Sequence, residues 1–547
     1  THPDYIPLGD RSRKRLARMA NPGDPAWVDV ISRMYPTPND LLELAESPYI
    51  DRPIVMCEYA HAMGNSLGNL SDYWDLVTAH PNLIGGYIWD WVDQGLAETA
   101  PDGSTFFQYG GDYGDTPNDT NFCLNGIIAS DQRPKPAIEE AKYIFQPIGF
   151  EAADLANGVV RVLNRHAITN VNAFELRWSV SADGDEIQSG LLPAHSVVPG
   201  AHGTITVPFA AIDPVTGKEY WLRVSAHLAA DSLWADAGHE VAKEQFALPF
   251  FKPASVPAPK GKAPAIDKTG DVITMRAGQA QVGLDARSGL VTSYQVNGEE
   301  LLVSPLTPNF WRVPTDNDAR GWRTPQNRQL WRDLPGLLQI DSITTSTDVG
   351  VSRIHVTATH EDLVTVTTTY SLSAAGELTA TLKIAADPKL PSLLRVGMTF
   401  EVPAAFDHAT YYGRGPMENY VDRRHATEVD VYDLAVADFG EPYVRPQEHG
   451  NRTDVRWLSL RDTEGHTLTI TGAQPLSMSV WPYSTETLAT ATHTPDLTTG
   501  EVTTVNVDLI QTGVGGNDTW SPNAAPLPHY QIPAGTYEYS FTLKVTP

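Results

Sequence analysis

Residues 53–65 read Pro53-Ile54-Val55-Met56-Cys57-Glu58-Tyr59-Ala60-His61-Ala62-Met63-Gly64-Asn65, and this stretch decides the fold of the first part of the chain. Its apolar run predicts a buried strand that ends at Glu58. The segment 66–77 spaces its apolar residues as on an amphipathic helix, with Ser66 available as the N-cap. A second apolar run follows at 83–89. The order strand, helix, strand predicts a βαβ unit.

Both predicted strands are apolar throughout, which is typical of a parallel sheet covered on both faces. In β/α barrels the catalytic residues lie at the carboxyl ends of the strands, and Glu58 and the pair Trp89-Asp90 occupy such ends. In isolation, an acid in this position more often pairs with a neighbouring Arg. The motifs around Glu58 favour a catalytic role instead.

Two further long motifs follow in order: Gly85-Gly86-Tyr87-Ile88-Trp89-Asp90-Trp91-Val92-Asp93-Gln94, and Tyr109-Gly110-Gly111-Asp112-Tyr113-Gly114-Asp115-Thr116-Pro117-Asn118-Asp119. Together with 53–65 they resemble the large, multidomain β-galactosidases of glycoside hydrolase family 2. Shorter motifs extend the likeness at 122–126, 412–420 and 513–522. The resemblance runs from about residue 30 onward and implies the carboxyl-terminal portion of such an enzyme.

The resemblance implies hydrolysis of terminal non-reducing β-D-galactosides, of the lactose type, with retention of configuration. A retaining site uses one carboxylate as nucleophile and a second, protonated carboxyl group about 5 Å away that assists the leaving oxygen. Glu58 fits the first role, so a covalent galactosyl-enzyme is expected to form on it.

The second carboxyl group is where this sequence departs from the family. The family's acid/base glutamate follows an Asn on an earlier barrel strand, and residues 1–57 contain no Asn-Glu pair. Glu43 and Glu46 lie on the polar face of a predicted helix and are weak candidates. Two explanations stay open: the carboxyl-terminal portion of a longer enzyme, or a deletion through the barrel. A complete barrel needs about 250 residues, which favours the first.

Four more site residues follow from the resemblance. Tyr35 matches a tyrosine that stabilises the nucleophile, and His61 matches a residue that hydrogen-bonds a sugar hydroxyl. Trp89 offers a flat apolar face to galactose, and Trp520 matches a distant aromatic that stacks on the second sugar or aglycone. Each has a plainer alternative: a packed phenol for Tyr35, a structural His, or a core Trp.

The cofactors implied by the resemblance are Na⁺ and Mg²⁺. Phe122, through its carbonyl oxygen, and Asn125, through its side chain, match sodium ligands, and Asn125 is also expected to bind the substrate, although Asn125-Gly126 alone indicates a turn. The family's Mg²⁺ ligands, which include the missing acid, are expected upstream and not in this chain.

Composition excludes several classes of partner. With 39 basic and 66 acidic side chains the formal net charge is −27, which repels phosphate backbones and argues against nucleic-acid partners. No apolar run approaches the roughly eighteen residues of a membrane span. The two cysteines form no CxxC motif and indicate buried thiols in a reducing compartment, so we expect a cytoplasmic protein. The resemblance also implies a homo-oligomer.

The pattern of elements predicts three domains in a multidomain α/β plus all-β chain. Residues 1–147 are expected to be the carboxyl-terminal part of a catalytic (β/α)8 barrel, and 148–256 an immunoglobulin-like β-sandwich. A proline-rich stretch at 250–264 indicates a linker. Residues 257–547, with alternating runs such as 364–372, are expected to form a large antiparallel β-sandwich whose loops at 314–318 and around Trp520 lean over the barrel.

Three function classes therefore stand at this point. The first is a retaining β-galactosidase. The second is a catalytically incomplete carbohydrate-binding or complementation fragment of one, which the missing acid favours. The third is a sibling chemistry, β-glucuronidase or β-mannosidase, which the galactosidase-like motifs disfavour.

Overall fold

The computed structural model describes residues 27–48, 50–254 and 259–546. It divides into two compact units, one of residues 1–140, 259–427 and 433–547, and one of residues 141–258 and 428–432. The predicted boundary between 256 and 257 lies outside the described residues, and the division into three domains stays a prediction. No helix within the described ranges combines the length and apolarity needed to cross a membrane.

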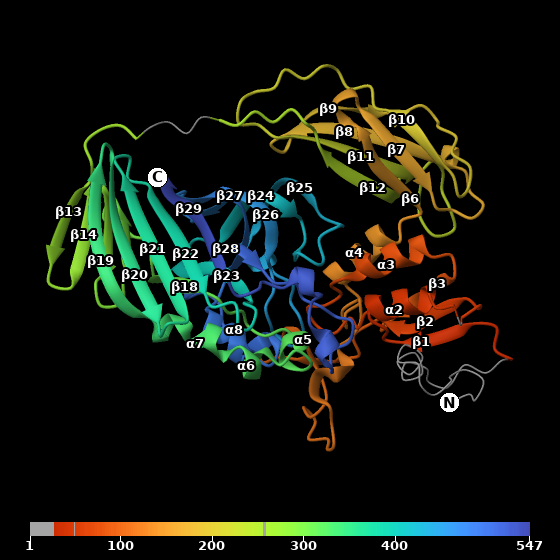
Figure 1. Cartoon of the computed structure of the whole chain (residues 1–547), viewed down its shortest axis with the longest axis horizontal. Coiled ribbons are helices and arrows are strands. Elements are labelled where there is room, and N and C mark those ends of the chain that lie inside the picture. Colours follow the sequence, from red (N-terminus) through yellow and green to blue (C-terminus); the bar gives the residue numbers. More distant parts are fainter. Residues whose placement is uncertain (1–26, 49, 255–258, 547) are drawn as a thin grey trace. The chain divides into compact units, whose positions relative to one another are not determined.

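A small parallel sheet begins the first unit (Figure 1). Its strands, in the order β1-β2-β3, are β1 (Ile31–Met34), β2 (Ile54–Tyr59) and β3 (Leu83–Ile88), joined by helices α2 (Pro38–Ala45) and α3 (Leu70–Ala79). This confirms the predicted strand, helix and strand around Glu58. Among the described residues, β1 and β3 each have one strand neighbour only, which is β2.

The loop between β2 and α3 corrects one prediction. Helix α3 begins at Leu70, and Asn69 precedes it with φ 61° and no side-chain cap, so the expectation that Ser66 caps this helix is wrong. The Ser66 hydroxyl instead donates to the His61 carbonyl oxygen at 2.7 Å. Residues 59–71 are all buried, so tertiary contacts and not local helix propensity set the conformation of this loop.

The segment after β3 carries little regular structure. It contains the hairpin β4 (Leu96–Thr99) and β5 (Thr105–Gln108), the short 3-10 helix η1 (Thr120–Cys123), and helix α4 (Pro136–Ile144).

The second unit contains two antiparallel sheets, with strand orders β10-β7-β6 and β12-β11-β8-β9. The strands are β6 (Ile148–Asp154), β7 (Val159–Asn164), β8 (Phe174–Ala182), β9 (Asp185–Leu191), β10 (His202–Thr206), β11 (Tyr220–Leu228) and β12 (Glu240–Ala247), with 3-10 helices η2 (Leu155–Asn157) and η3 (Val171–Ala173). Apolar residues of both sheets, such as Val162 and Leu222, belong to one core cluster.

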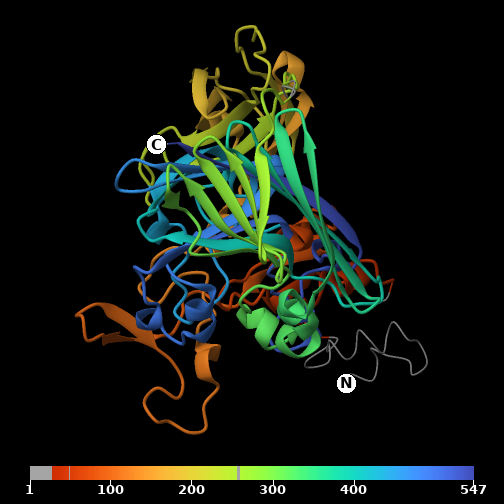
Figure 2. The same cartoon turned by 90° about the vertical axis from the view of Figure 1, so that its left-hand side faces the viewer.

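A 17-stranded sheet, nearly all of which belongs to the first unit, curls on itself through additional pairings such as β18 with β23 and β22 with β29 (Figure 2). Its strands are β13 (Ala265–Thr269), β14 (Val272–Ala277), β15 (Ala280–Asp285), β16 (Leu290–Val296), β17 (Glu299–Glu300), β18 (Ser304–Asn309), β19 (Gln339–Asp348), β20 (Val351–His360), β21 (Val364–Ser373), β22 (Leu378–Ala386), β23 (Arg395–Pro403), β24 (His408–Gly415), β25 (Glu428–Ala435), β26 (Arg452–Arg461), β27 (Thr467–Trp481), β28 (Val502–Gln511) and β29 (Thr536–Thr546). Strand β21 alternates buried and half-buried residues along its whole length, as its sequence predicts.

Short helices occupy the connections of this sheet. They are α5 (Asp316–Ala319), α6 (Thr324–Asn327), α7 (Gln329–Leu337), α8 (Thr485–Thr490), η4 (Val436–Asp438), η5 (Thr494–Asp496), η6 (Pro522–Ala524) and η7 (Pro528–Tyr530).

Candidate active site

Glu58 lies near the carboxyl end of β2, and the Tyr35 phenol lies close enough to its carboxylate to interact with it. Tyr35 follows β1 directly, and its backbone N–H donates to the Glu58 carbonyl oxygen at 2.7 Å. Burial, followed by the charge of Glu58, raises the pKa of Tyr35. The phenol therefore stays protonated at neutral pH and can act as a donor to an ionised carboxylate.

The backbone turns sharply where β1 and β2 end. Tyr35 has φ 49° and Ala60 has φ 52°, both in the left-handed region that residues with a Cβ rarely adopt. Such conformations cost about 1–3 kcal/mol each and persist where the surroundings enforce them, often at functional sites. Here the two residues flank Glu58 in space.

Aromatic rings gather next to Tyr35. The Trp520 ring meets the Tyr35 ring edge-on at 4.7 Å between centroids and the His61 ring at 5.2 Å. The His61 ring also stacks on Phe122 at 5.4 Å. Trp89 follows β3 with two-fifths of its surface exposed, and its backbone bonds to Tyr59 and Ala62 tie it to the end of β2. Trp89 and Trp520 thus keep exposed surface near the ends of β1 and β2.

His61 is a neutral imidazole in this setting. Burial is the main cause that lowers its pKa to about 3, and the charges of Arg320 and Lys135 act in the same direction. Its Nδ1 lies 2.7 Å from the Thr519 hydroxyl. At neutral pH His61 therefore offers a hydrogen bond and no charge.

The large sheet's connections hold the buried loop 60–69. Gly515 O accepts from Gly68 N at 2.7 Å, Asp422 O accepts from Asn69 N at 3.0 Å, and the Gln447 side chain accepts from Asn65 N at 3.1 Å. These partners lie 350 or more positions along the chain from the loop. As predicted, the connection that carries Trp520 therefore lies against the β/α segment.

Asn125 and Phe122 lie on one turn at the edge of the site. The Asn125 side-chain amide donates to the Phe122 carbonyl oxygen at 3.0 Å, and the Asn125 carbonyl oxygen accepts from Asp90 N at 2.7 Å. The structure thus brings all seven predicted residues together: Tyr35, Glu58, His61, Trp89, Phe122, Asn125 and Trp520.

Sequence reasoning missed several residues that shape the site. The Arg320 guanidinium lies over the Phe122 ring at 5.2 Å from its centroid. The Asp518 carboxyl group, whose pKa burial raises, is close enough to Tyr35 to add to its pKa shift, as is that of Asp90, which the sequence already placed at a strand end. Asp518 adjoins the predicted Trp520, but nothing local in the sequence points to Arg320.

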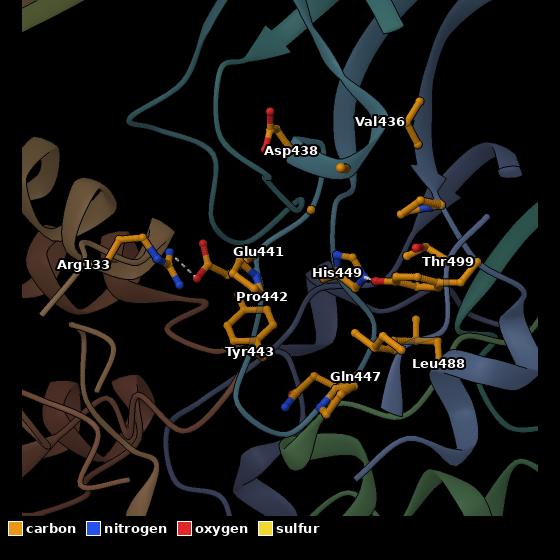
Figure 3. A pocket seen from close by; sticks show the side chains of 16 residues that line it. Arg133, Val436, Asp438, Glu441, Pro442, Tyr443, Gln447, His449, Leu488 and Thr499 are labelled. Carbon is orange, nitrogen blue, oxygen red and sulfur yellow. Dashed lines mark hydrogen bonds and ion pairs between the residues drawn. The ribbon is translucent and has the colours of Figure 1, made fainter. Parts of the chain in front are cut away.

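A cavity of about 500 Å³ lies in the first unit, and Glu58 is not among the residues that line it (Figure 3). It is lined by the loop 436–449 and by Tyr483, Leu488 and Thr499, among others. Gln447 lines it and also accepts from Asp316 N at 3.0 Å, in addition to its bond with Asn65. One side chain, that of Gln447, therefore both lines the cavity and holds the buried loop.

Comparisons with known proteins match these parts in order. Residues 18–150 match the family described as "Glycosyl hydrolases family 2, TIM barrel domain". Residues 160–249 match "Beta-galactosidase, domain 4", and residues 276–543 match "Beta galactosidase small chain".

Individual relatives agree with the family matches. A β-galactosidase of Priestia megaterium is 38% identical over 94% of this chain and 50% of its own length. A β-galactosidase of Vibrio cholerae is 33% identical over 91% of this chain and 48% of its own length. The chain thus spans about half the length of the relatives it matches. Because its β/α segment, its second unit and its large sheet all match in order, the chain belongs to glycoside hydrolase family 2.

Proposed function

We propose that this chain carries the nucleophile of a retaining β-galactosidase that hydrolyses terminal non-reducing β-D-galactosides such as lactose. A Glu58 oxygen attacks the anomeric carbon, the bond from that carbon to the aglycone oxygen breaks, and the leaving oxygen takes a proton from an acid. A galactosyl ester on Glu58 results, and water then displaces the carboxylate to give galactose. The observation that carries the proposal is the position of Glu58 at the carboxyl end of β2, with the Tyr35 phenol beside its carboxylate.

Tyr35 would act differently in the two steps. Its hydrogen bond is strongest when Glu58 is charged, that is, before attack and again when the carboxylate leaves the sugar. One Glu58 oxygen held by the phenol leaves the other directed at the anomeric carbon. Trp89 and Trp520, both partly exposed, provide apolar faces for the galactose ring and for the aglycone.

We also propose Na⁺ as a cofactor. The Phe122 carbonyl oxygen and the Asn125 side-chain oxygen would hold it, in place of the hydrogen bond that the Asn125 amide donates to Phe122 O at 3.0 Å. Bound there, Na⁺ would supply a positive charge for a sugar hydroxyl. For Mg²⁺, the described residues contain no group of three or more His, Cys, Asp or Glu side chains that could hold it, so its ligands would lie elsewhere.

A trapping experiment tests the proposal without needing the acid. In a 2-deoxy-2-fluorogalactoside that carries dinitrophenolate, the leaving group departs without help from an acid. Attack by Glu58 alone should therefore add one fluorogalactosyl mass to the chain. Peptide mapping should place the mass on Glu58, and Glu58→Gln should abolish it. Glu43→Gln, on the exposed side of α2, is the matched control and should label normally. Labelling that survives Glu58→Gln would contradict the assignment.

The catalytically incomplete fragment is a second candidate. The absent Asn-Glu pair favours it, and so do the outer strands β1 and β3, which have one neighbour each among the described residues. Unpaired strand edges are places where further strands add. This candidate predicts galactose binding without turnover, and turnover on addition of the first half of a relative such as the Priestia enzyme.

Finer parts of the proposal concern specificity and setting. Turnover or trapping by galactosides, and not by glucuronides or mannosides, would separate the galactosidase from its sibling chemistries. We also interpret the second unit as an immunoglobulin-like sandwich and the large sheet as a sandwich, and we expect a cytoplasmic homo-oligomer. Gel filtration with light scattering checks the last expectation.

A further inference from the structure

A closed chain of buried hydrogen bonds lies behind His61. The Thr519 hydroxyl donates to Asn317 Oδ1 at 2.8 Å, and the Asn317 side-chain NH₂ donates to Val514 O at 3.0 Å and to Ser66 Oγ at 3.2 Å. The Ser66 hydroxyl in turn donates to the His61 carbonyl oxygen. His61, Ser66, Asn317 and Thr519 are each no more than 1% exposed.

The donor and acceptor of each bond can be assigned by starting from the Val514 carbonyl group. Val514 O is a carbonyl and can only accept, so the Asn317 amide nitrogen must face it. Ser66 supports this orientation, because its single proton is committed to the His61 carbonyl and its oxygen can only accept from Asn317. A flipped amide would set its oxygen against two acceptors, which buried groups rarely tolerate.

The orientation of Asn317 then decides the proton of Thr519. Asn317 Oδ1 can only accept, so the single hydroxyl proton of Thr519 points to it. Toward His61 the Thr519 oxygen therefore presents a lone pair. The Nδ1 atom of His61 lies 2.7 Å from this oxygen, so Nδ1 must carry a proton and donate it to the lone pair. In a neutral imidazole the other nitrogen, Nε2, is then an acceptor.

We infer that Thr519 and Asn317 are positioning residues that hold His61 in the Nδ1–H tautomer, so that Nε2 is offered to the substrate as a hydrogen-bond acceptor. This rests on the proposed function for the identity of the substrate, a galactoside, whose hydroxyl groups would donate to Nε2. Neither residue needs to touch the sugar. The tautomer decides the direction of one hydrogen bond between His61 and the substrate. Nε2 would accept from a hydroxyl group of the substrate and could not donate to it.

The tautomer can be read directly in the chain itself. In the protein labelled with [¹⁵N]histidine, two-bond ¹H–¹⁵N correlation spectra distinguish a protonated ring nitrogen from a bare one. The His61 signals are assigned by their loss in His61→Gln. We expect a protonated Nδ1 and a bare Nε2 at neutral pH. A protonated Nε2 in the unmodified chain would overturn the inference, whatever the variants do.

Two variants of Thr519 separate its hydroxyl from its shape. Thr519→Ser keeps the hydroxyl and should keep the Nδ1–H tautomer. Thr519→Val keeps the volume, removes the acceptor, and should shift His61 toward Nε2–H. An unchanged tautomer in a folded Thr519→Val chain would overturn the role of Thr519.

Galactose titration provides the functional readout. We expect Thr519→Val to weaken galactose binding about threefold to tenfold, the loss of one neutral hydrogen bond, and Thr519→Ser to restore it. Binding that is equally weak in both folded variants would overturn the positioning role. If galactose does not bind the unmodified chain, the proposed function fails, while the spectra still decide the tautomer.

Discussion

Replacement of Tyr35 by Phe tests the step that matters most for the proposed mechanism. The phenol lies beside Glu58 and in the proposed mechanism donates to it, and a hydrogen bond to a charged group contributes about 1.5–3 kcal/mol. The ring contacts with Trp520 and His61 do not involve the hydroxyl, so Phe should retain the packing. The variant therefore isolates the hydrogen bond.

The expected effect falls on the second step. Glu58 loses its charge on attack and regains it when the sugar leaves, so the phenol stabilises the departing carboxylate. Without it, the galactosyl ester should decay about tenfold to hundredfold more slowly, which is the rate equivalent of the lost energy. Formation of the ester should change less, because the charged nucleophile loses the same stabilisation before attack.

The assay follows the lifetime of the fluorogalactosyl adduct by intact mass. Azide, a nucleophile that needs no general base, reactivates the enzyme. Tyr59→Phe is the matched control, because its neighbouring phenol accepts from Trp74 at 2.9 Å and its side chain points to the opposite face of β2. We expect the adduct to last about tenfold to hundredfold longer in Tyr35→Phe. A lifetime within about twofold of that in the unmodified chain would refute the reasoning.

Three further outcomes follow from the structure. Trp520→Ala should weaken binding of galactosides with an aromatic aglycone about threefold to tenfold, the worth of one aromatic contact, while galactose titration of the same variant should be nearly unchanged. Lys135→Met leaves the buried Asp93 carboxylate without its partner at 3.2 Å and should cost about 3–5 kcal/mol of stability; urea unfolding should show the loss, and an added Asp93→Asn should recover part of it. Burial raises the pKa of Glu441 from 4.5 to about 7, despite its ion pair with Arg133. The unfolded chain therefore releases this proton first, and stability should fall by up to about 3 kcal/mol as the pH rises from 4.5 to 7. Comparing thermal unfolding at both ends of this window should show a smaller fall in Glu441→Gln, and an equal fall in both proteins would contradict the assignment.

The parts of the site that could be predicted are local in sequence. Glu58 and Trp89 could be predicted because each ends an apolar run, and such a run is typical of a strand in a parallel sheet. His61 follows within the same motif. The predicted positions of these residues needed no knowledge of distant partners.

The parts that could not be predicted depend on distant partners. Ser66 reads as a helix cap, yet its hydroxyl bonds to His61 O and accepts from Asn317, 251 positions away. Arg320 reaches the Phe122 ring from a connection of the large sheet. No periodicity in the sequence records such contacts, since the pattern of a segment reports which face it buries and not against what.

The dependence of the buried loop 60–69 on the connection 513–520 has a consequence for biosynthesis. The ribosome makes the loop early, but Gly515 and Thr519, which bond to Gly68 and His61, emerge about 450 residues later. At translation rates of about 5–20 residues per second, Glu58 is made tens of seconds before the residues that hold the neighbouring loop. If Glu58 is the nucleophile, a nascent chain released before residue 513 should carry it and still fail to form a galactosyl ester, so that labelling of this carboxylate would report that synthesis has passed residue 519.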